Sequence, residues 1–402
     1  GGPLSSLTLC EMLMKLAQSV VATPTRKANL MSISQELYTR VFTKLRTVHP
    51  EPHLKRIANW VWVIVGLVLS HSVHLSQIAQ HIPSEAQAAG RIAQVRRWLS
   101  NKFIQVPDFY RPLITEALQG WAHQDVFVIL DGCSVNHEAL QFFRLSLSHC
   151  FRAIPLAWLV VKGPGLITVE KCEALLNEAA QLLRQVATVT FLADRGFRDK
   201  DWAQKCRKLR WNYGIRVANN TGVTLADGRV LAIHTLGVKP GHARYFQNVR
   251  LTAESDWTCN LAVTWTKATP KQPAELCAIA LNLTAGQRTL KDYLKRMHIE
   301  QSFRDDKSGS FDLEATKLTD PERLNHLLLA IAVAVLWIYD IGEHVLRADE
   351  RQEIDPAYKR QLSVFQIGWR KLHRWLSCQS STLPFLTLRL SPFRLAPAWR
   401  KC

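Results

Sequence analysis

Four residues in the second half of the chain have types and spacing that suit chemistry on a charged polymer. Tyr293, Arg296, Glu300 and Lys307 stand at offsets of 3, 7 and 14 residues from the tyrosine. At about 100° per residue on an α-helix they fall within an arc of roughly 60°. A stripe at this period normally holds apolar residues, whereas this one holds a carboxylate, two cations and a phenol. The pattern predicts a helix, beginning near Thr289, that faces a nucleic-acid backbone and a metal ion.

Two further carboxylates stand where predicted buried strands end. Asp131 closes the apolar run 126–130, and Asp194 closes the run 189–193. With Glu300 they supply three hard oxygen donors, which suit Mg²⁺ or Mn²⁺ better than zinc. Two such ions can activate a water or a 3′-hydroxyl and stabilise the leaving oxygen of a phosphodiester. Each aspartate taken singly is more often a cap or a turn residue, so the hypothesis depends on the combination.

Several catalytic and metal-binding motifs are missing from the sequence. The run that ends in Asp131 could also be the metal-binding strand of a P-loop ATPase. No G-x-x-x-x-G-K-[ST] motif occurs in the sequence, which excludes that class of protein. A G-x-S-x-G elbow and an H-E-x-x-H helix are missing too. The nine cysteines form no C-x-x-C pair, which favours free thiols in a reducing compartment. His71 and His74 are spaced for a metal, but a structural role is favoured because no third ligand is nearby in the sequence.

Composition limits the class of protein. The 402 residues suffice for two or three domains, and 47% apolar residues can bury a sizeable core. Lys plus Arg number 51 against 33 acids, a net charge of +18 that favours nucleic acid as partner, with a membrane surface as the alternative. The apolar runs 60–69 and 327–339 are shorter than the about 20 residues that span a bilayer, so we expect buried helices. The N-terminus does not read as a signal peptide, and we expect a cytoplasmic protein.

The elements that position these residues begin with a helical block. Residues 75–82 and 90–99 resemble a helix-turn-helix, because a turn at Pro83 separates two short helices and the second carries Arg91, Arg96 and Arg97. Packing in an ordinary bundle with a basic face explains the same pattern equally well. Helix-length apolar periodicity covers residues 34–48, 57–71, 75–81, 88–102 and 108–121.

A mixed sheet follows this block. Strands are predicted at 126–131, 145–148, 156–161, 189–194 and 213–218, with helices at 170–185 and 199–209. Residues 219–284 contain short β-prone runs between turn signals and predict a small β subdomain. The runs lie at 223–225, 229–234, 245–252, 260–266 and 276–283, and a buried helix is predicted at 324–339. The tail, 351–402, has ten Lys or Arg and two acids, a net charge of +8.

The combination of motifs resembles the DDE transposases of bacterial insertion sequences, specifically the group with a Y-x2-R-x3-E-x6-K signature. Tyr293, Arg296, Glu300 and Lys307 match that signature at every position. The surrounding I-E-Q-S-F-R-D-D-K-S at 299–308 is similar to the family's I-E-x-x-F-R-D-x-K-S core. A-D-R-G-F at 193–197 resembles the second-acid motif, and the Leu-Asp pair at 130–131 resembles the first. The resemblance covers roughly residues 60–345.

The resemblance implies a ribonuclease-H-like catalytic domain interrupted by a β-rich insertion, here residues 219–284. It implies that Asp131, Asp194 and Glu300 bind two Mg²⁺ or Mn²⁺ ions and catalyse strand cleavage and 3′-hydroxyl strand transfer. Tyr293, Arg296 and Lys307 would then bind phosphates near the transposon end. In hairpin-forming relatives an aromatic residue of the insertion stacks on a flipped base. Trp257 and Trp265 are the candidates here, but neither lies in the last strand before the helix, so the hairpin step stays open.

The sequence therefore predicts a mixed α/β protein that acts as a DNA transposase. We expect a leader or a poorly ordered N-terminus at 1–30, a helical DNA-binding domain at 31–120, a catalytic domain at 121–345 and a basic C-terminal region at 346–402. The expected partners are double-stranded DNA, as terminal inverted repeats and target, and a second copy of the chain in a synaptic complex, without a membrane. The protein would lie with the DNA of a bacterial nucleoid. The alternatives are a catalytically silent, domesticated DNA-binding protein and a host nuclease with a ribonuclease-H fold.

Overall fold

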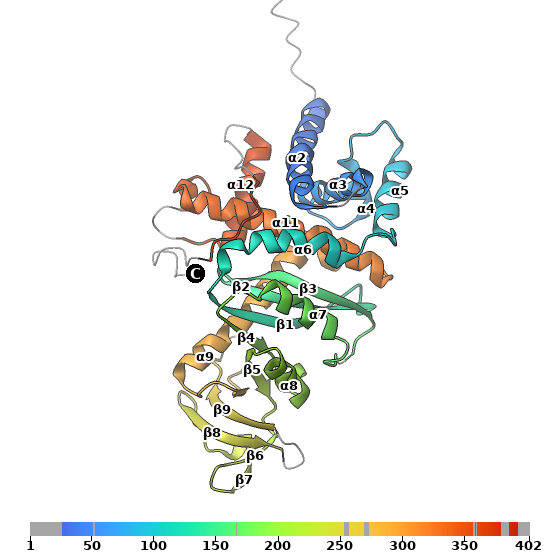
Figure 1. Ribbon diagram of the computed structural model, residues 1–402. Helices are drawn as coiled ribbons and strands as arrows, with labels where there is room; N and C mark the ends of the chain where they lie inside the picture. Colours follow the sequence, from blue (N-terminus) through green and yellow to red (C-terminus); the bar gives the residue numbers. More distant parts are fainter. Residues whose placement is uncertain are drawn as a thin grey trace, which may run out of the picture.

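The computed structural model describes residues 26–50, 53–165, 167–252, 257–268, 273–356, 358, 360–378 and 386–392. Most of the predicted leader, 1–30, lies outside these residues. The described chain begins with a long helix, α2 (Arg26–Val48), followed by four more helices that form one end of the molecule (Figure 1). These are α3 (Leu54–Ser70), α4 (Leu75–Gln80), α5 (Ala88–Leu99) and α6 (Val106–Ala117). The predicted helical block is thus confirmed, and the apolar run 60–69 lies in α3, most of which is buried.

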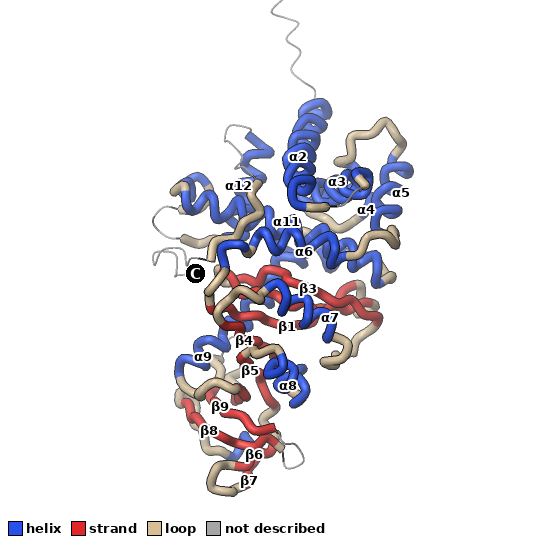
Figure 2. Tube along the Cα trace, in the orientation of Figure 1, coloured by secondary structure: helices blue, strands red, loops and turns tan. Residues whose placement is uncertain are grey.

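A sheet of ten strands forms the centre of the fold (Figure 2). Its first part consists of β1 (Asp125–Val135), β2 (Leu140–His149), β3 (Arg152–Lys162), β4 (Thr188–Ala193) and β5 (Asn212–Val217). These strands lie in the order β3-β2-β1-β4-β5; β1, β2 and β3 are antiparallel, and β1, β4 and β5 are parallel. The parallel strands are connected through α7 (Glu173–Leu182) and α8 (Lys200–Lys208). The predicted mixed α/β, ribonuclease-H-like class is confirmed.

The predicted β subdomain is an extension of this same sheet. Its strands are β6 (Gly222–Thr224), β7 (Val230–Ala232), β8 (Ala243–Leu251), β9 (Trp257–Trp265) and β10 (Leu276–Leu281). All five were predicted within a few residues. The insertion is not a separate sheet, because β10 pairs with β5 on one side and with β9 on the other. The last strand of the insertion therefore joins the insertion to the catalytic sheet through backbone hydrogen bonds.

The helix that carries the polar stripe is not one regular α-helix. It consists of α9 (Gln287–Tyr293), the 3₁₀ turn η4 (Leu294–Arg296), α10 (Met297–Arg304) and the π-helical segment η5 (Asp305–Gly309). The uniform 100° spacing was therefore wrong in detail, since 3₁₀ and π segments wind more tightly and more loosely than an α-helix. Tyr293 ends α9, Arg296 ends η4, Glu300 lies in α10 and Lys307 lies in η5.

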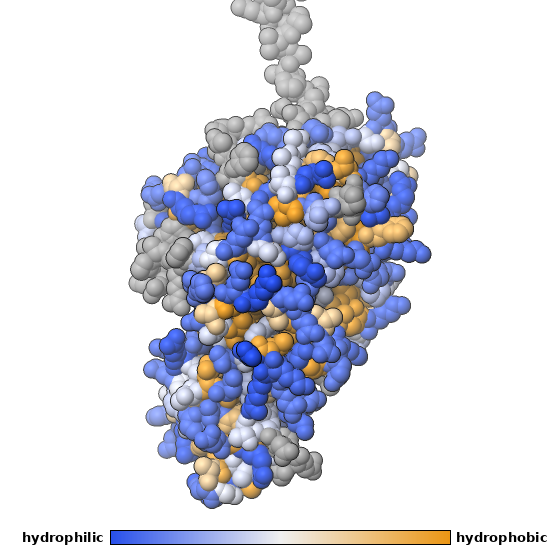
Figure 3. Space-filling view, in the orientation of Figure 1, coloured by the Kyte–Doolittle hydropathy of each residue, from blue (hydrophilic) through white to orange (hydrophobic). Residues whose placement is uncertain are grey.

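The longest helix of the second half, α11 (Pro321–Arg347), packs against α3 on one side and β3 on the other, while α6 lies beside it next to the sheet (Figure 1). It contains the predicted buried helix 324–339 and extends beyond it. Its length and hydropathy would suit a membrane span, but 94% of its most apolar window is buried inside the protein. It packs against α3, α6, α12 and β3, as expected of a core helix. Hydrophilic side chains cover most of the face seen in Figure 3.

Part of the basic tail is held against α11. After α12 (Val364–Cys378), residues 386–392 run in an extended conformation. The buried carboxylate of Asp340 accepts hydrogen bonds from the backbone N–H groups of Thr387 (2.7 Å) and Leu388 (3.0 Å). Glu343, also buried, accepts one from Ser391 (2.9 Å). These bonds compensate for burying two acids on an apolar helix.

Candidate active site

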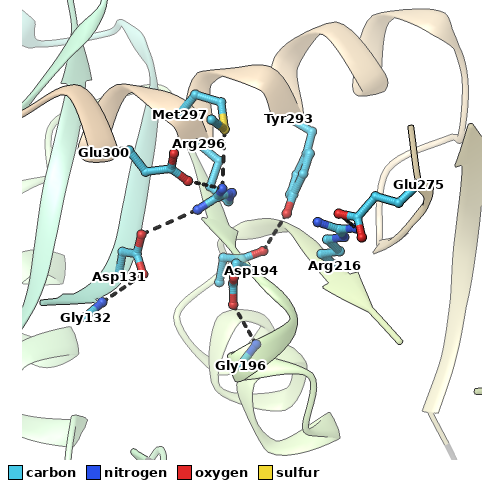
Figure 4. A network of polar contacts seen from close by, with 11 residues as sticks. Asp131, Gly132, Asp194, Gly196, Arg216, Glu275, Tyr293, Arg296, Met297 and Glu300 are labelled. Atoms are coloured by element: carbon cyan, nitrogen blue, oxygen red, sulfur yellow. Dashed lines mark hydrogen bonds and ion pairs between the residues drawn. The ribbon is translucent and has the colours of Figure 1, made fainter. Parts of the chain in front are cut away.

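Asp131 and Asp194 lie beside each other where the parallel pairing of β1 and β4 ends. Asp194 follows the last residue of β4, whereas Asp131 lies within β1, which continues to Val135 in its pairing with β2. The predicted strand end at Asp131 was therefore wrong, although its position beside Asp194 follows from the register. In the register of β1 and β4, Leu130 pairs with Ala193, so the two acids occupy the next position on each strand. Asp194 caps the 3₁₀ turn η2 (Arg195–Phe197), where its Oδ1 accepts a hydrogen bond from the Gly196 N–H at 2.6 Å. The Asp131 Oδ1 accepts one from the Gly132 N–H at 2.8 Å. The strands therefore bring the two predicted aspartates together (Figure 4).

Glu300 reaches the same place from α10, and Arg296 lies between it and Asp131 (Figure 4). The guanidinium places Nη1 3.4 Å from the Asp131 Oδ2, and its Nη2 donates to the Glu300 Oε1. The arginine side chain is only 12% exposed, so this contact is well shielded from solvent. The structure thus shows Arg296 bound to two of the predicted metal-binding acids.

Tyr293 contacts the residue before Asp194, and Lys307 lies near β1. The Tyr293 hydroxyl donates to the backbone carbonyl of Ala193 at 3.1 Å, one residue before Asp194, and its ring is buried. Lys307 forms an ion pair with Glu314 at 3.0 Å. It also lies close enough to Cys133 to lower the pKa of that buried thiol, which burial raises to about 11. Cys133 is two residues from Asp131 and so shares its face of β1.

The electrostatics of Asp131 show that the three acids influence one another. Burial raises the pKa of Asp131 to about 6. The charges of Asp194 and Glu300 act in the same direction, while Arg296 and the Gly132 N–H oppose them. Negative charge therefore accumulates at one point, where a cation is favoured.

The donor chemistry of these residues fits a divalent cation. Three carboxylates, each from a different element, are the hard ligands that Mg²⁺ and Mn²⁺ prefer. Within the described residues, however, no group of three His, Cys, Asp or Glu side chains is arranged to hold an ion. Arg296 contacts one carboxylate oxygen of Asp131 and one of Glu300, and the Asp194 carboxylate accepts a hydrogen bond from the Gly196 N–H. The residues fit a divalent cation by the type of their ligand atoms and by the proximity of Asp131, Asp194 and Glu300.

Three cations near the site were not predicted from the sequence. Arg216 on β5 pairs with Glu275 at 2.5 Å beside Tyr293 (Figure 4). Arg144 and Arg152, on β2 and β3, pair with acids of η5. Their common signal was an arginine within an apolar strand segment, which is rare unless a buried acid compensates it.

Other predicted candidates have contacts elsewhere. The indole N–H of Trp257 donates to the Tyr213 hydroxyl at 3.2 Å, and that of Trp265 donates to the Val238 carbonyl at 2.7 Å. Trp257 is buried, whereas Trp265 is partly exposed. His71 contacts His373 of α12, with 3.2 Å between Nε2 and Nδ1, and forms no metal cluster within the described residues.

In the predicted helix-turn-helix, α4 packs against α5, but the three arginines differ in role. Arg91 donates to the carbonyls of Ser84 and Ala86 and so stabilises the turn. Arg96 and Arg97 are exposed on α5 and are the two arginines of this motif that face solvent.

Seven of the nine cysteines lie in the described residues, and all seven are free thiols, as expected.

Comparison with known families agrees with this geometry. Residues 173–337 match the family described as Transposase DDE domain. The match begins at α7, ends within α11, and includes Asp194 and Glu300 but not Asp131. No curated protein matches the chain. The chain therefore contains a transposase DDE domain over residues 173–337, a domain type that acts in DNA transposition and implies DNA binding and divalent metals.

Proposed function

We propose that this protein is a DNA transposase that cleaves transposon ends and joins their 3′-hydroxyls to target DNA. The observation that carries the proposal is the meeting of Asp131 and Asp194, where the parallel pairing of β1 and β4 ends, with Glu300 on α10. The strand order β3-β2-β1-β4-β5 and the DDE domain match support the same assignment. We further propose the division into a helical domain (31–120), a catalytic domain (121–345) with its insertion (219–284), and a basic C-terminal region (346–402).

In this proposal Asp131, Asp194 and Glu300 would hold two Mg²⁺ or Mn²⁺ ions. Such ions, when bound, activate the attacking water or 3′-hydroxyl and stabilise the leaving oxygen. Arg296, which contacts Asp131 and Glu300, and Lys307, which lies near Cys133 two residues from Asp131, would bind phosphates of the strand being cut. Tyr293 holds the helix to the end of β4 through Ala193, which fixes its ring beside Asp194. Two ends must be handled together, which favours a homodimeric synaptic complex.

The test uses a labelled duplex that carries the inverted repeats found in the DNA flanking the gene. We expect nicking at the repeat boundary in Mg²⁺ or Mn²⁺, none in EDTA, and strand-transfer products when a target plasmid is added. Binding without cleavage in either metal would favour the silent DNA-binding protein. Cleavage without joined products, on any duplex, would favour a host nuclease.

The phosphate contacts make a prediction about salt dependence. Lys307→Gln should weaken binding to the end duplex and lower the slope of log K against log salt by about 0.9, one phosphate contact. Fluorescence anisotropy across a range of KCl concentrations measures this slope. Arg229→Gln is the matched control, because Arg229 pairs with Asp227 at an exposed turn of the insertion. An unchanged slope for Lys307→Gln would remove this residue from the DNA contacts.

The raised pKa of Asp131 makes a prediction about pH. Ligation needs the carboxylate form, so at subsaturating Mg²⁺ the nicking rate should fall as pH drops through about 6. Arg296 lowers the pKa of Asp131, so Arg296→Gln should move this midpoint to higher pH. Single-turnover rates between pH 5 and 8 provide the profile, with pH buffered by overlapping buffers of constant ionic strength. A midpoint that stays in place in Arg296→Gln would contradict this coupling.

A further inference from the structure

The helix that carries Glu300 has a second polar face, which packs against the sheet. His298 Nδ1 lies 2.8 Å from the Ser148 Oγ, and the Ser302 Oγ accepts a hydrogen bond from the Ala153 N–H at 2.7 Å. Within the regular α-helix α10, at about 100° per residue, His298 and Ser302 lie on the side opposite to Glu300. Contacts on this face therefore set the rotation of the face that carries Glu300.

Two ion pairs dominate this second face. Asp306 pairs with Arg144 at 2.5 Å, and both side chains are only 3% exposed. Asp305 pairs with Arg152 at 2.5 Å, with side chains 10% and 13% exposed. The acids are consecutive in the chain, yet both reach arginines of neighbouring strands. The π-helical winding of η5 brings both to the sheet, and π segments occur frequently at functional sites.

Arg144 links this face directly to the candidate active site. In the register of β1 and β2 it is paired with Asp131, so the two side chains emerge on the same face of the sheet. Its guanidinium also lies over the Phe303 ring, 4.6 Å from the ring centre. One side chain thus contacts two residues of the Glu300 helix from the position opposite Asp131.

We propose that Asp305 and Asp306, with Arg152 and Arg144, are positioning residues that fix Glu300 against Asp131 and Asp194. This inference rests on the proposed transposase function. The four residues touch no substrate; they hold the helix at one rotation and height above the strands. Catalytic carboxylates need such support because a displacement of about 1 Å can cost about a hundredfold in rate. Outer residues that orient ligands affect metal affinity or activity by about 10–100-fold.

The central test is Asp305→Asn, because this pair lies nearer the surface than the Arg144–Asp306 pair. We expect a folded variant with DNA affinity within about twofold of wild type. Its single-turnover cleavage rate at saturating DNA should fall about 10–100-fold, with a higher Mg²⁺ concentration needed for half-maximal rate. Asp306→Asn should show a larger loss, since it leaves a buried arginine without its partner. Thermal melting, anisotropy and Mg²⁺ titration of the cleavage rate are the measurements.

Exchanging the charges of the Asp305–Arg152 pair distinguishes a positioning role from general damage to the fold. Asp305→Arg alone should lose activity, and adding Arg152→Asp should restore a large part of the rate and of the Mg²⁺ dependence. Asp227→Asn, at the exposed Asp227–Arg229 pair, is the control and should leave all three readouts unchanged. Wild-type rate and Mg²⁺ dependence in a folded Asp305→Asn protein would overturn the positioning role. Wild-type protein that never cleaves would instead overturn the proposed function.

Discussion

Glu300→Gln is expected to abolish cleavage of the transposon end while DNA binding persists. The substitution keeps the size of the side chain but removes the charge that a hard divalent cation needs. Because metal ions contribute several kcal/mol to such reactions, the rate should fall by about a thousandfold or more. The Glu300 side chain is 38% exposed, so little stability should be lost. Single-turnover cleavage of a labelled end, beside anisotropy with the same duplex, measures both properties.

The same loss is expected for Asp131→Asn and Asp194→Asn. An asparagine can still accept the backbone hydrogen bonds from Gly132 and Gly196, so the strand ends should keep their shape. Glu322→Gln is the matched control, as an exposed glutamate on α11 away from the site. Full cleavage by any one of the three variants would contradict the proposed catalytic carboxylates. Normal DNA binding with no cleavage by the wild type would make the protein a binding module.

The two aspartates and the polar stripe could be predicted because each depends on local sequence. The run of apolar residues before Asp194 specifies a buried strand and its end, and the run before Asp131 specifies a buried strand. The end of β1 was not predicted, because the strand continues to Val135 through its pairing with β2. Adjacent positions at one sheet edge then follow from parallel pairing. The interruptions of the helix could not be predicted in this way. They place Asp305 and Asp306 against Arg152 and Arg144, which lie about 150 residues earlier in the chain.

The extent of the sheet was harder to predict for a similar reason. Turn signals and alternation located β6 to β10 within a few residues, because a strand is specified by its own short stretch of sequence. The partner with which a strand pairs is not specified locally. The place of β10 between β5 and β9 depends on contacts across the insertion. The role of Arg296 also required the structure. A cation one turn from Glu300 suggested a phosphate contact, while its bond to Asp131 depends on how α10 sits above β1.

Gly368→Val is expected to cause the largest loss of stability of any single substitution considered for this chain. α12 crosses α11 at a pair of glycines, Gly342 and Gly368. A Cβ atom at Gly368 would overlap the carbonyl oxygen of Ile338 and approach the Gly342 nitrogen to 2.8 Å. One at Gly342 would overlap the carbonyl oxygen of Val364. Backbone cannot yield as a flexible side chain can, so the helices would have to separate.

Separation of α12 from α11 would expose part of the core, because residues of both helices are buried where they meet, among them Phe365 and Leu372. We expect a loss of about 3 kcal/mol or more, which for a chain of this length corresponds to a fall in Tm of roughly 4 °C or more. Differential scanning calorimetry or near-UV circular dichroism melting measures the shift. Gly222→Val is the control, because a Cβ there meets nothing within 4 Å and β-branched residues suit a strand. Equal melting temperatures for the two variants would show that α11 and α12 do not meet through their backbones.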